Sequence, residues 1–174
     1  MNAMKRRSVA LATGICSVIL LAAPASAVAQ QASTRSALEG IWSLVSIVSE
    51  TGGKRSEPAG PDPVGLFIFD RSGYYAIQIF RRDLPAIASG DRNRTTPDED
   101  KAVNQGALAH FGTYKVDDKA GTFTIHPTGS SFANWTGKAM PRRFEVTGDD
   151  LKIINPSSSK DPTATSYLIL KRAR

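Results

Sequence analysis

Strand-forming segments joined by short turns dominate the sequence from residue 41 to its end. VGLFIFD and YYAIQIF, for example, flank a turn in which Asp70 and Gly73 supply the backbone geometry of a β-hairpin. The sequence predicts eight such strands, over residues 41–49, 64–70, 74–80, 110–116, 122–127, 141–147, 151–155 and 166–174. Their sequential order predicts an all-β, antiparallel up-and-down barrel, because closure removes the exposed edges that a flat sheet would keep.

One segment departs from this β pattern. Thr96 is placed to cap a helix, Pro97 suits its first turn, and Glu99 follows the threonine by three residues. This is a capping box. We therefore expect one short helix over residues 97–109, inserted between the third and fourth strands, with Gly106 as a weak point.

The first 29 residues have the order of a secretory signal peptide. Lys5, Arg6 and Arg7 precede a mostly apolar run, which ends in small residues that permit cleavage near Ala27 or Ala29. The run is too short for a transmembrane helix, so we expect an exported protein, secreted or periplasmic, with no integral membrane span after cleavage. Residues 30–36 then form a flexible lead-in, and residues 37–174 form one domain.

Removal of the leader changes the charge and the cysteine content. The leader holds three of the 22 basic residues and none of the 16 acidic ones, so its loss halves the net charge of +6. The remaining bias is too weak to indicate nucleic acid as a partner. The single cysteine is lost as well, which leaves the mature chain without disulfide or thiolate chemistry.

Five segments resemble the small lipocalin-like domain family of bacteria and fungi. They are LEGIWSLVS, PVGLFIFDRSGYYAIQ, HFGTYKVDDKAGTFTIHP, NWTGKAMPRRFEVTGDDLKI and LILKR. The first holds a G-x-W and the last a basic residue, and the resemblance covers about residues 37–173. It implies an eight-stranded barrel with a cavity, and it implies no particular function.

Gly40, Trp42 and Arg172 are the candidates for closing the barrel. The first and last strands of a closed barrel must pair, and a guanidinium can stack on an indole while it donates to nearby carbonyl groups. This contact would be structural and would seal one end, so a ligand is expected toward the other end. The alternative is that Trp42 is an ordinary core residue and Arg172 is solvated.

Arg142 is the first candidate for binding a ligand. By strand alternation it shares a face with Phe144 and Val146, which would aim it into the barrel. A guanidinium in an apolar cavity needs an anionic partner, and the carboxylate of a ligand could be that partner. The alternative is that Arg142 lies at the rim, in water.

The other candidates for a ligand site are aromatic or polar side chains on expected walls and loops. His126 could act as a general base, although it lies on the face of Thr122 and Thr124, which also fits a surface or structural histidine. A structural role is expected for His110. The remaining candidates could line the cavity or simply fill the core, and they are Tyr75, Gln78, Tyr114 and the loop residue Trp135.

No metal site or cofactor is expected, since the mature chain has two histidines, no cysteine and none of the familiar catalytic motifs. The pattern favours an exported barrel that binds a small, mostly apolar or amphipathic molecule without catalysis, and a carboxylate is the ligand class that Arg142 suggests. One alternative is an isomerase or cyclase in which His126 or a tyrosine moves protons. A second is a filled barrel that acts as an interaction module. The sequence indicates neither the ligand nor the oligomeric state.

Overall fold

The computed structural model describes residues 35–155 and 163–174. The predicted signal peptide and most of the lead-in lie outside the described residues, so both stay predictions. No helix in the described part of the chain is long and apolar enough to cross a membrane.

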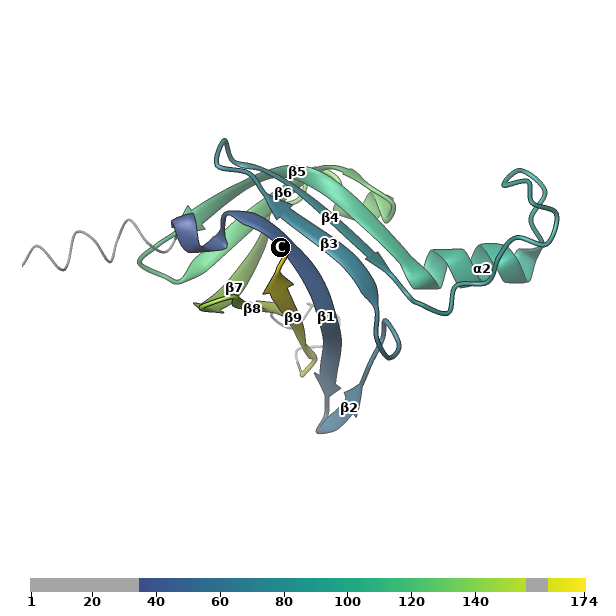
Figure 1. Cartoon of the computed structure of the whole chain (residues 1–174), viewed down its shortest axis with the longest axis horizontal. Helices are drawn as coiled ribbons and strands as arrows, with labels where there is room; N and C mark the ends of the chain where they lie inside the picture. Colours follow the sequence, from purple (N-terminus) through teal and green to yellow (C-terminus); the bar gives the residue numbers. More distant parts are fainter. Residues whose placement is uncertain (1–34, 156–162) are drawn as a thin grey trace, which may run out of the picture.

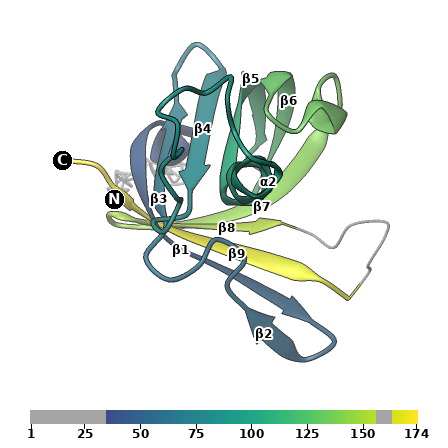
Figure 2. The same cartoon turned by 90° about the vertical axis from the view of Figure 1, so that its right-hand side faces the viewer.

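One antiparallel sheet of nine strands forms the molecule, and it closes on itself because the first strand also pairs with the last (Figures 1 and 2). Eight of the strands make the barrel, as expected, and β2 is additional. The strands are β1 (Gly40–Thr51), β2 (Lys54–Ser56), β3 (Val64–Phe69), β4 (Tyr74–Phe80), β5 (Ala107–Asp117), β6 (Thr122–Ser130), β7 (Met140–Thr147), β8 (Asp150–Asn155) and β9 (Thr165–Arg172).

The helix lies one strand later in chain order than predicted, because the structure has an additional strand, β2. β2 pairs only with the last residues of β1, across a turn in which Gly52 and Gly53 both have positive φ. All three residues of β2 are exposed, so no apolar alternation marked it as a strand. Because β2 precedes β3, the helix α2 (Pro97–Gly106) lies between β4 and β5, the fourth and fifth strands in chain order, rather than between the third and fourth.

The helix α2 begins as expected and ends earlier than expected. Thr96 accepts a hydrogen bond from the Glu99 amide, and Glu99 accepts one from the Thr96 amide, which confirms the capping box. The helix stops at Gly106 rather than residue 109, because Ala107 and Ala109 already pair with β4. The helix therefore projects from the barrel where β4 ends and β5 begins (Figure 1).

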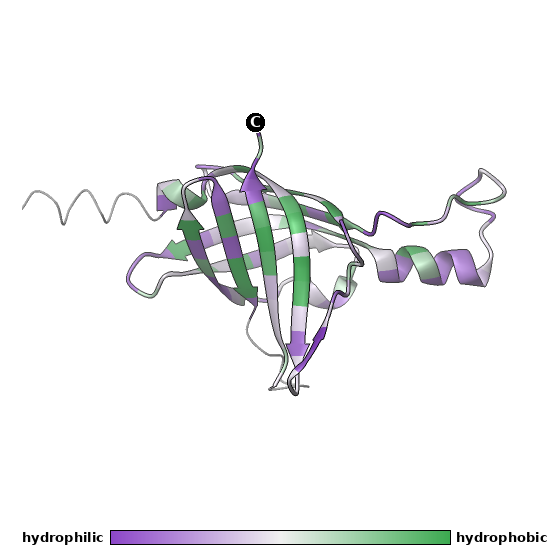
Figure 3. Ribbon diagram, turned by 60° about the horizontal axis from the view of Figure 1, so that its bottom comes forward, coloured by the Kyte–Doolittle hydropathy of each residue, from purple (hydrophilic) through white to green (hydrophobic). Residues whose placement is uncertain are grey.

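The core lies inside the barrel, and hydropathy alternates along the strands (Figure 3). Aromatic rings meet edge to face at one end, where Phe69 contacts both Tyr114 and Phe123, with centroids 5.3 and 5.4 Å apart. Phe123 in turn contacts Phe144 at 5.6 Å. This is the end where β1 begins and β9 finishes, and these rings pack in its interior.

A short 3-10 helix, η1 (Ala133–Trp135), follows β6 at the opposite end of the barrel. Its backbone holds Trp135 through a turn, in which the Trp135 amide donates to the Phe132 carbonyl at 3.0 Å. The element thus places an indole beside the strand ends at which β1, β4 and β6 finish and β5 and β9 begin.

Candidate functional site

The sealed end of the barrel is organised around Arg172 and Trp42. The two residues lie opposite each other in the register of β1 and β9, and the guanidinium carbon is 4.1 Å from the centroid of the indole. Trp42 has no exposed surface. This contact joins the first strand to the last at the seam of the barrel.

A helical turn over residues 35–38 covers this end, and the same pair of side chains binds three carbonyl groups in and just after its last residues. Arg172 donates from Nη1 to the Glu39 carbonyl and from Nη2 to the Ala37 carbonyl, each at 3.0 Å. The Trp42 indole donates to the Leu38 carbonyl at 2.9 Å. The two side chains therefore satisfy carbonyl groups that the end of a helical turn leaves without partners.

Gly40 gives the chain the room that this arrangement needs. Its φ is +126°, and a Cβ at this position would lie 2.7 Å from the Arg172 Nη1. A side chain would thus strain the backbone and displace the guanidinium.

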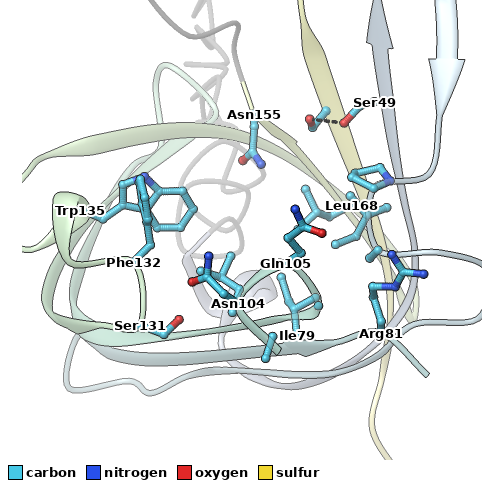
Figure 4. Close-up of a pocket in the computed structure, with 17 residues that line it drawn as sticks. Ser49, Ile79, Arg81, Asn104, Gln105, Ser131, Phe132, Trp135, Asn155 and Leu168 are labelled. Atoms are coloured by element: carbon cyan, nitrogen blue, oxygen red, sulfur yellow. Dashed lines mark hydrogen bonds between the residues drawn. The ribbon is translucent and has the colours of Figure 1, made fainter. Parts of the chain in front are cut away.

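The opposite end of the barrel is hollow, with a cavity of about 610 Å³ (Figure 4). Trp135 and Phe132 lie on one side of it, and Leu168 and Ser49 lie on the other. The end of α2 contributes Asn104 and Gln105 to the rim. The lining residues that face inward from the barrel strands are mostly aliphatic, and they include Ile47, Ile79, Leu108 and Leu168.

We call this larger space the mouth cavity. A smaller pocket of about 60 Å³, the inner pocket, borders it. The two share five lining residues, which are Ile79, Leu108, Trp135, Asn155 and Leu168. The inner pocket adds two polar side chains, His110 from β5 and Arg142 from β7, against a wall of aliphatic and aromatic residues. The wide mouth cavity, in whose lining Arg81 is ion-paired with Asp83, therefore leads to a narrow one that holds a second cation, Arg142.

Arg142 lies on the inner face of β7 and has few partners there. Its only hydrogen bond within the described residues runs from Nη1 to the neighbouring Pro141 carbonyl, at 2.9 Å. No acidic side chain in the described ranges forms an ion pair with it. Burial lowers the pKa of Arg142 to about 10, which still leaves the guanidinium charged at neutral pH.

His110 is buried beside Arg142, with 6% of its surface exposed. Its Nδ1 lies 2.9 Å from the Tyr75 hydroxyl, and its ring meets Trp135 edge to face at 5.4 Å. Burial, with a smaller contribution from the Arg142 charge, lowers the pKa of His110 to about 4. The imidazole is therefore neutral at physiological pH.

The second ring nitrogen of His110 is open to the cavity. Nε2 has no hydrogen-bond partner in the described part of the chain. No side-chain nitrogen or oxygen among the described residues is both sealed from solvent and unpaired. Nε2 is therefore reachable from the inner pocket that His110 lines, as are the Arg142 nitrogens that have no partner within residues 35–155 and 163–174.

Three of the predicted ligand-site residues come together at this inner pocket. Arg142 and Trp135 line it, and the Tyr75 hydroxyl reaches it through His110. Tyr75 itself is 3% exposed, and burial raises the pKa of its hydroxyl well above the usual value, so the hydroxyl stays protonated.

The other three predicted residues do not reach the cavity. Tyr114 is buried at the sealed end, where its hydroxyl donates to the Asp70 carbonyl at 3.0 Å. Gln78 is exposed on the outer face of β4. His126 is partly exposed and alternates with the buried Ile125 and Pro127 on β6, which places it outside the barrel.

Sequence reasoning did not assign His110 to the site. The signal was present, because the alternation that put Tyr114 inside the barrel continues back through Gly112 to His110. Asn104 and Gln105 gave no comparable signal, since their position at the rim depends on how α2 leaves the barrel.

No group of three or more histidine, cysteine, aspartate or glutamate side chains within residues 35–155 and 163–174 is placed to hold a metal ion. A family model described as a lipocalin-like domain matches residues 39–173 of the chain. A search of curated proteins found no match.

Proposed function

The chain belongs to the lipocalin-like domain family, and from this premise we propose that it binds a small, mostly apolar molecule inside its barrel. The observation that carries the proposal is the cavity of about 610 Å³ at one end of the barrel, whereas aromatic rings pack against one another in the interior at the other end. This volume lies within the range of roughly 300–1,000 Å³ that is typical of small-molecule sites.

The lining of the cavity supports an amphipathic ligand with one acidic group. Ile47, Ile79 and Leu168 offer aliphatic surface to the body of such a molecule. Arg142 is the charged group on the inner side, and a carboxylate of the ligand would complement it. Asn104 and Gln105 would remain near solvent at the rim.

The two alternatives receive less support. A filled barrel acting as an interaction module would have side chains throughout its interior, whereas this barrel is hollow at one end. An isomerase or cyclase would need a proton carrier in the cavity. His126 lies on the outer face and the Tyr114 hydroxyl is bound to a backbone carbonyl. His110 and Tyr75 are at the inner pocket, but burial lowers the pKa of His110 to about 4 and raises that of Tyr75, which takes both away from the neutral pH at which a general acid or base works best.

The place of action is part of the same proposal. The leader over residues 1–29 directs export, and the mature barrel meets its ligand outside the cytoplasm. N-terminal sequencing of protein recovered from the periplasm or the culture fluid should begin after Ala27 or Ala29. If the protein recovered there still carried its intact leader, the proposed cleavage would be contradicted.

The binding proposal can be tested with the uncharged fluorophore N-phenyl-1-naphthylamine, which brightens in apolar surroundings. We expect saturable binding by the wild type. Ile79→Trp places an indole in the mouth cavity, so it should weaken binding about tenfold or more. The matched control is Phe80→Trp, because the neighbouring side chain points outward and its change should leave the affinity unaltered.

Either of two results would contradict the proposal. The wild type could fail to bind the fluorophore in a saturable manner. Alternatively, Ile79→Trp and Phe80→Trp could bind it with the same affinity, which would place the binding outside the barrel.

A further inference from the structure

We infer that the inner pocket is an anion-binding subsite, in which Arg142 and His110 together hold the acidic head group of the ligand. The apolar part of the molecule then extends outward through the mouth cavity. The inference rests on the proposed function and adds to it the ligand class, a monoanionic amphiphile, and the direction in which it enters.

The size of the inner pocket limits what can occupy it. Its volume of about 60 Å³ is close to that of two water molecules in the liquid, each of which takes roughly 30 Å³. A carboxylate group fits such a space, as would one or two carbons at the end of a chain, but a longer hydrocarbon chain does not. The chain must therefore lie in the larger cavity of about 610 Å³ that shares Leu108 and Leu168 with the pocket.

The charge of the inner pocket selects an anion. The guanidinium of Arg142 lines the pocket together with Phe123, Ile125 and Ile153. It has no acidic partner among the described residues. A guanidinium without a counter-ion in an apolar pocket is unfavourable, and an incoming carboxylate relieves this cost. Charge-assisted hydrogen bonds in such surroundings are about twice as strong as neutral ones.

His110 supplies the second donor. When an anion lies beside Nε2, the favoured neutral tautomer carries its proton on Nε2 and leaves the Nδ1 lone pair free. The Tyr75 hydroxyl, 2.9 Å from Nδ1, then donates to that lone pair. Tyr75 is thus a positioning residue, which fixes the tautomer and the orientation of the ring that binds the head group.

Trp135 connects the subsite with the mouth. Its ring packs on His110 at 5.4 Å and on Phe132 at 5.7 Å, and it borders both cavities. A ligand with its head at Arg142 would therefore pass along the indole, and its tail would end near Phe132, which is 49% exposed.

The test compares decanoic acid with decan-1-ol, which share a chain and differ at the head, as competitors for bound N-phenyl-1-naphthylamine. At pH 7.5 the wild type should bind the acid about tenfold or more tightly than the alcohol. Arg142→Gln should abolish this preference while its affinity for the alcohol changes less than about twofold. Retained binding of the alcohol also demonstrates that the variant is folded.

Arg143→Gln is the matched control for Arg142→Gln. It removes the same charge from the next residue of β7, which is exposed on the outer face. The acid preference of this variant should equal that of the wild type. If Arg143→Gln lowered the preference as much as Arg142→Gln, the effect would be a long-range one of net charge and the subsite would be disproved.

The ratio of the affinity for decanoic acid to that for decan-1-ol tests the roles of His110 and Tyr75. A purely structural role would leave this ratio unchanged. His110→Phe should lower that ratio at least threefold, and His110→Gln, whose amide still donates, should restore part of it. Tyr75→Phe should lower the ratio by less than His110→Phe. An unchanged ratio in His110→Phe would remove His110 from the subsite.

Failure of the inference and failure of the proposed function give different results. If the wild type binds the fluorophore and the acid and alcohol displace it equally, the inference is overturned and the barrel is still a carrier of apolar molecules. If the wild type does not bind the fluorophore at all, the proposed function itself is wrong.

Discussion

The two ends of the barrel use the same strands for opposite purposes. At the sealed end, Trp42 and Arg172 donate to the carbonyl groups of residues 37–39, and aromatic rings pack in the interior. At the open end, His110 Nε2 and the Arg142 nitrogens other than Nη1 have no partner within the described residues, and both side chains line a cavity. The sealed end therefore stabilises the fold, and the open end has hydrogen-bonding groups that are available to a ligand.

The largest effect that this comparison predicts concerns the two tryptophans. Trp42→Ala removes a fully buried indole and should lower the free energy of unfolding by about 3–5 kcal/mol. Trp135→Ala, at the partly exposed rim, should cost about 1 kcal/mol. Urea denaturation of both variants provides the measurement. Equal losses would show that the two ends do not differ in their contribution to stability.

The next effect concerns the seam. Arg172→Met keeps an unbranched apolar side chain at this position and removes two charge-assisted hydrogen bonds and the stacked cation, so it should cost about 3 kcal/mol. Lys171→Met is the control, since Lys171 is exposed on the outer face of the same strand, and its loss should cost less than about 0.5 kcal/mol. Thermal and urea unfolding that did not separate the two variants would argue against a structural role for Arg172.

A smaller effect comes from the open end and depends on pH. The pKa of His110 is about 4 in the fold and near 6.5 in the unfolded chain, so the unfolded chain takes up the proton first as the pH falls. The stability associated with neutral His110 is thus complete above pH 6.5 and is lost as the pH falls toward 4. Between pH 7 and pH 5 the ligand-free protein should lose up to about 2 kcal/mol through this residue.

His110→Gln isolates that contribution, because glutamine does not titrate. Urea unfolding at pH 7 and at pH 5 should show a smaller loss for His110→Gln than for the wild type, by up to about 2 kcal/mol. Losses of the same size in both proteins would mean that His110 is protonated in the fold as easily as in the unfolded chain.

The fold was predictable wherever alternation between apolar and polar residues is regular. The eight barrel strands follow it, and a closed antiparallel barrel is what the structure has. β2 was missed because its Lys54, Arg55 and Ser56 are all exposed and leave no periodic signal. The end of α2 was misplaced because pairing with β4 overrides helix propensity after Gly106.

The site was predictable only in part, for reasons that differ between residues. Arg142 was placed by alternation on the inner face, and the same rule applied consistently puts His110 inside and leaves His126 and Gln78 outside. The cavity itself has no local signature in the sequence. It depends on which side chains from distant strands fail to meet, so the residues that border it could not be derived from spacing.

The central claim, that the open end of the barrel holds a small acidic and mostly apolar molecule, is tested most directly by native mass spectrometry. The wild type and Ile79→Trp would be purified in parallel from the cells that make them. We predict one small molecule per wild-type chain, which organic solvent releases and which is missing from Ile79→Trp. A wild-type chain recovered repeatedly at its bare mass, or the same adduct on both proteins, would contradict the claim.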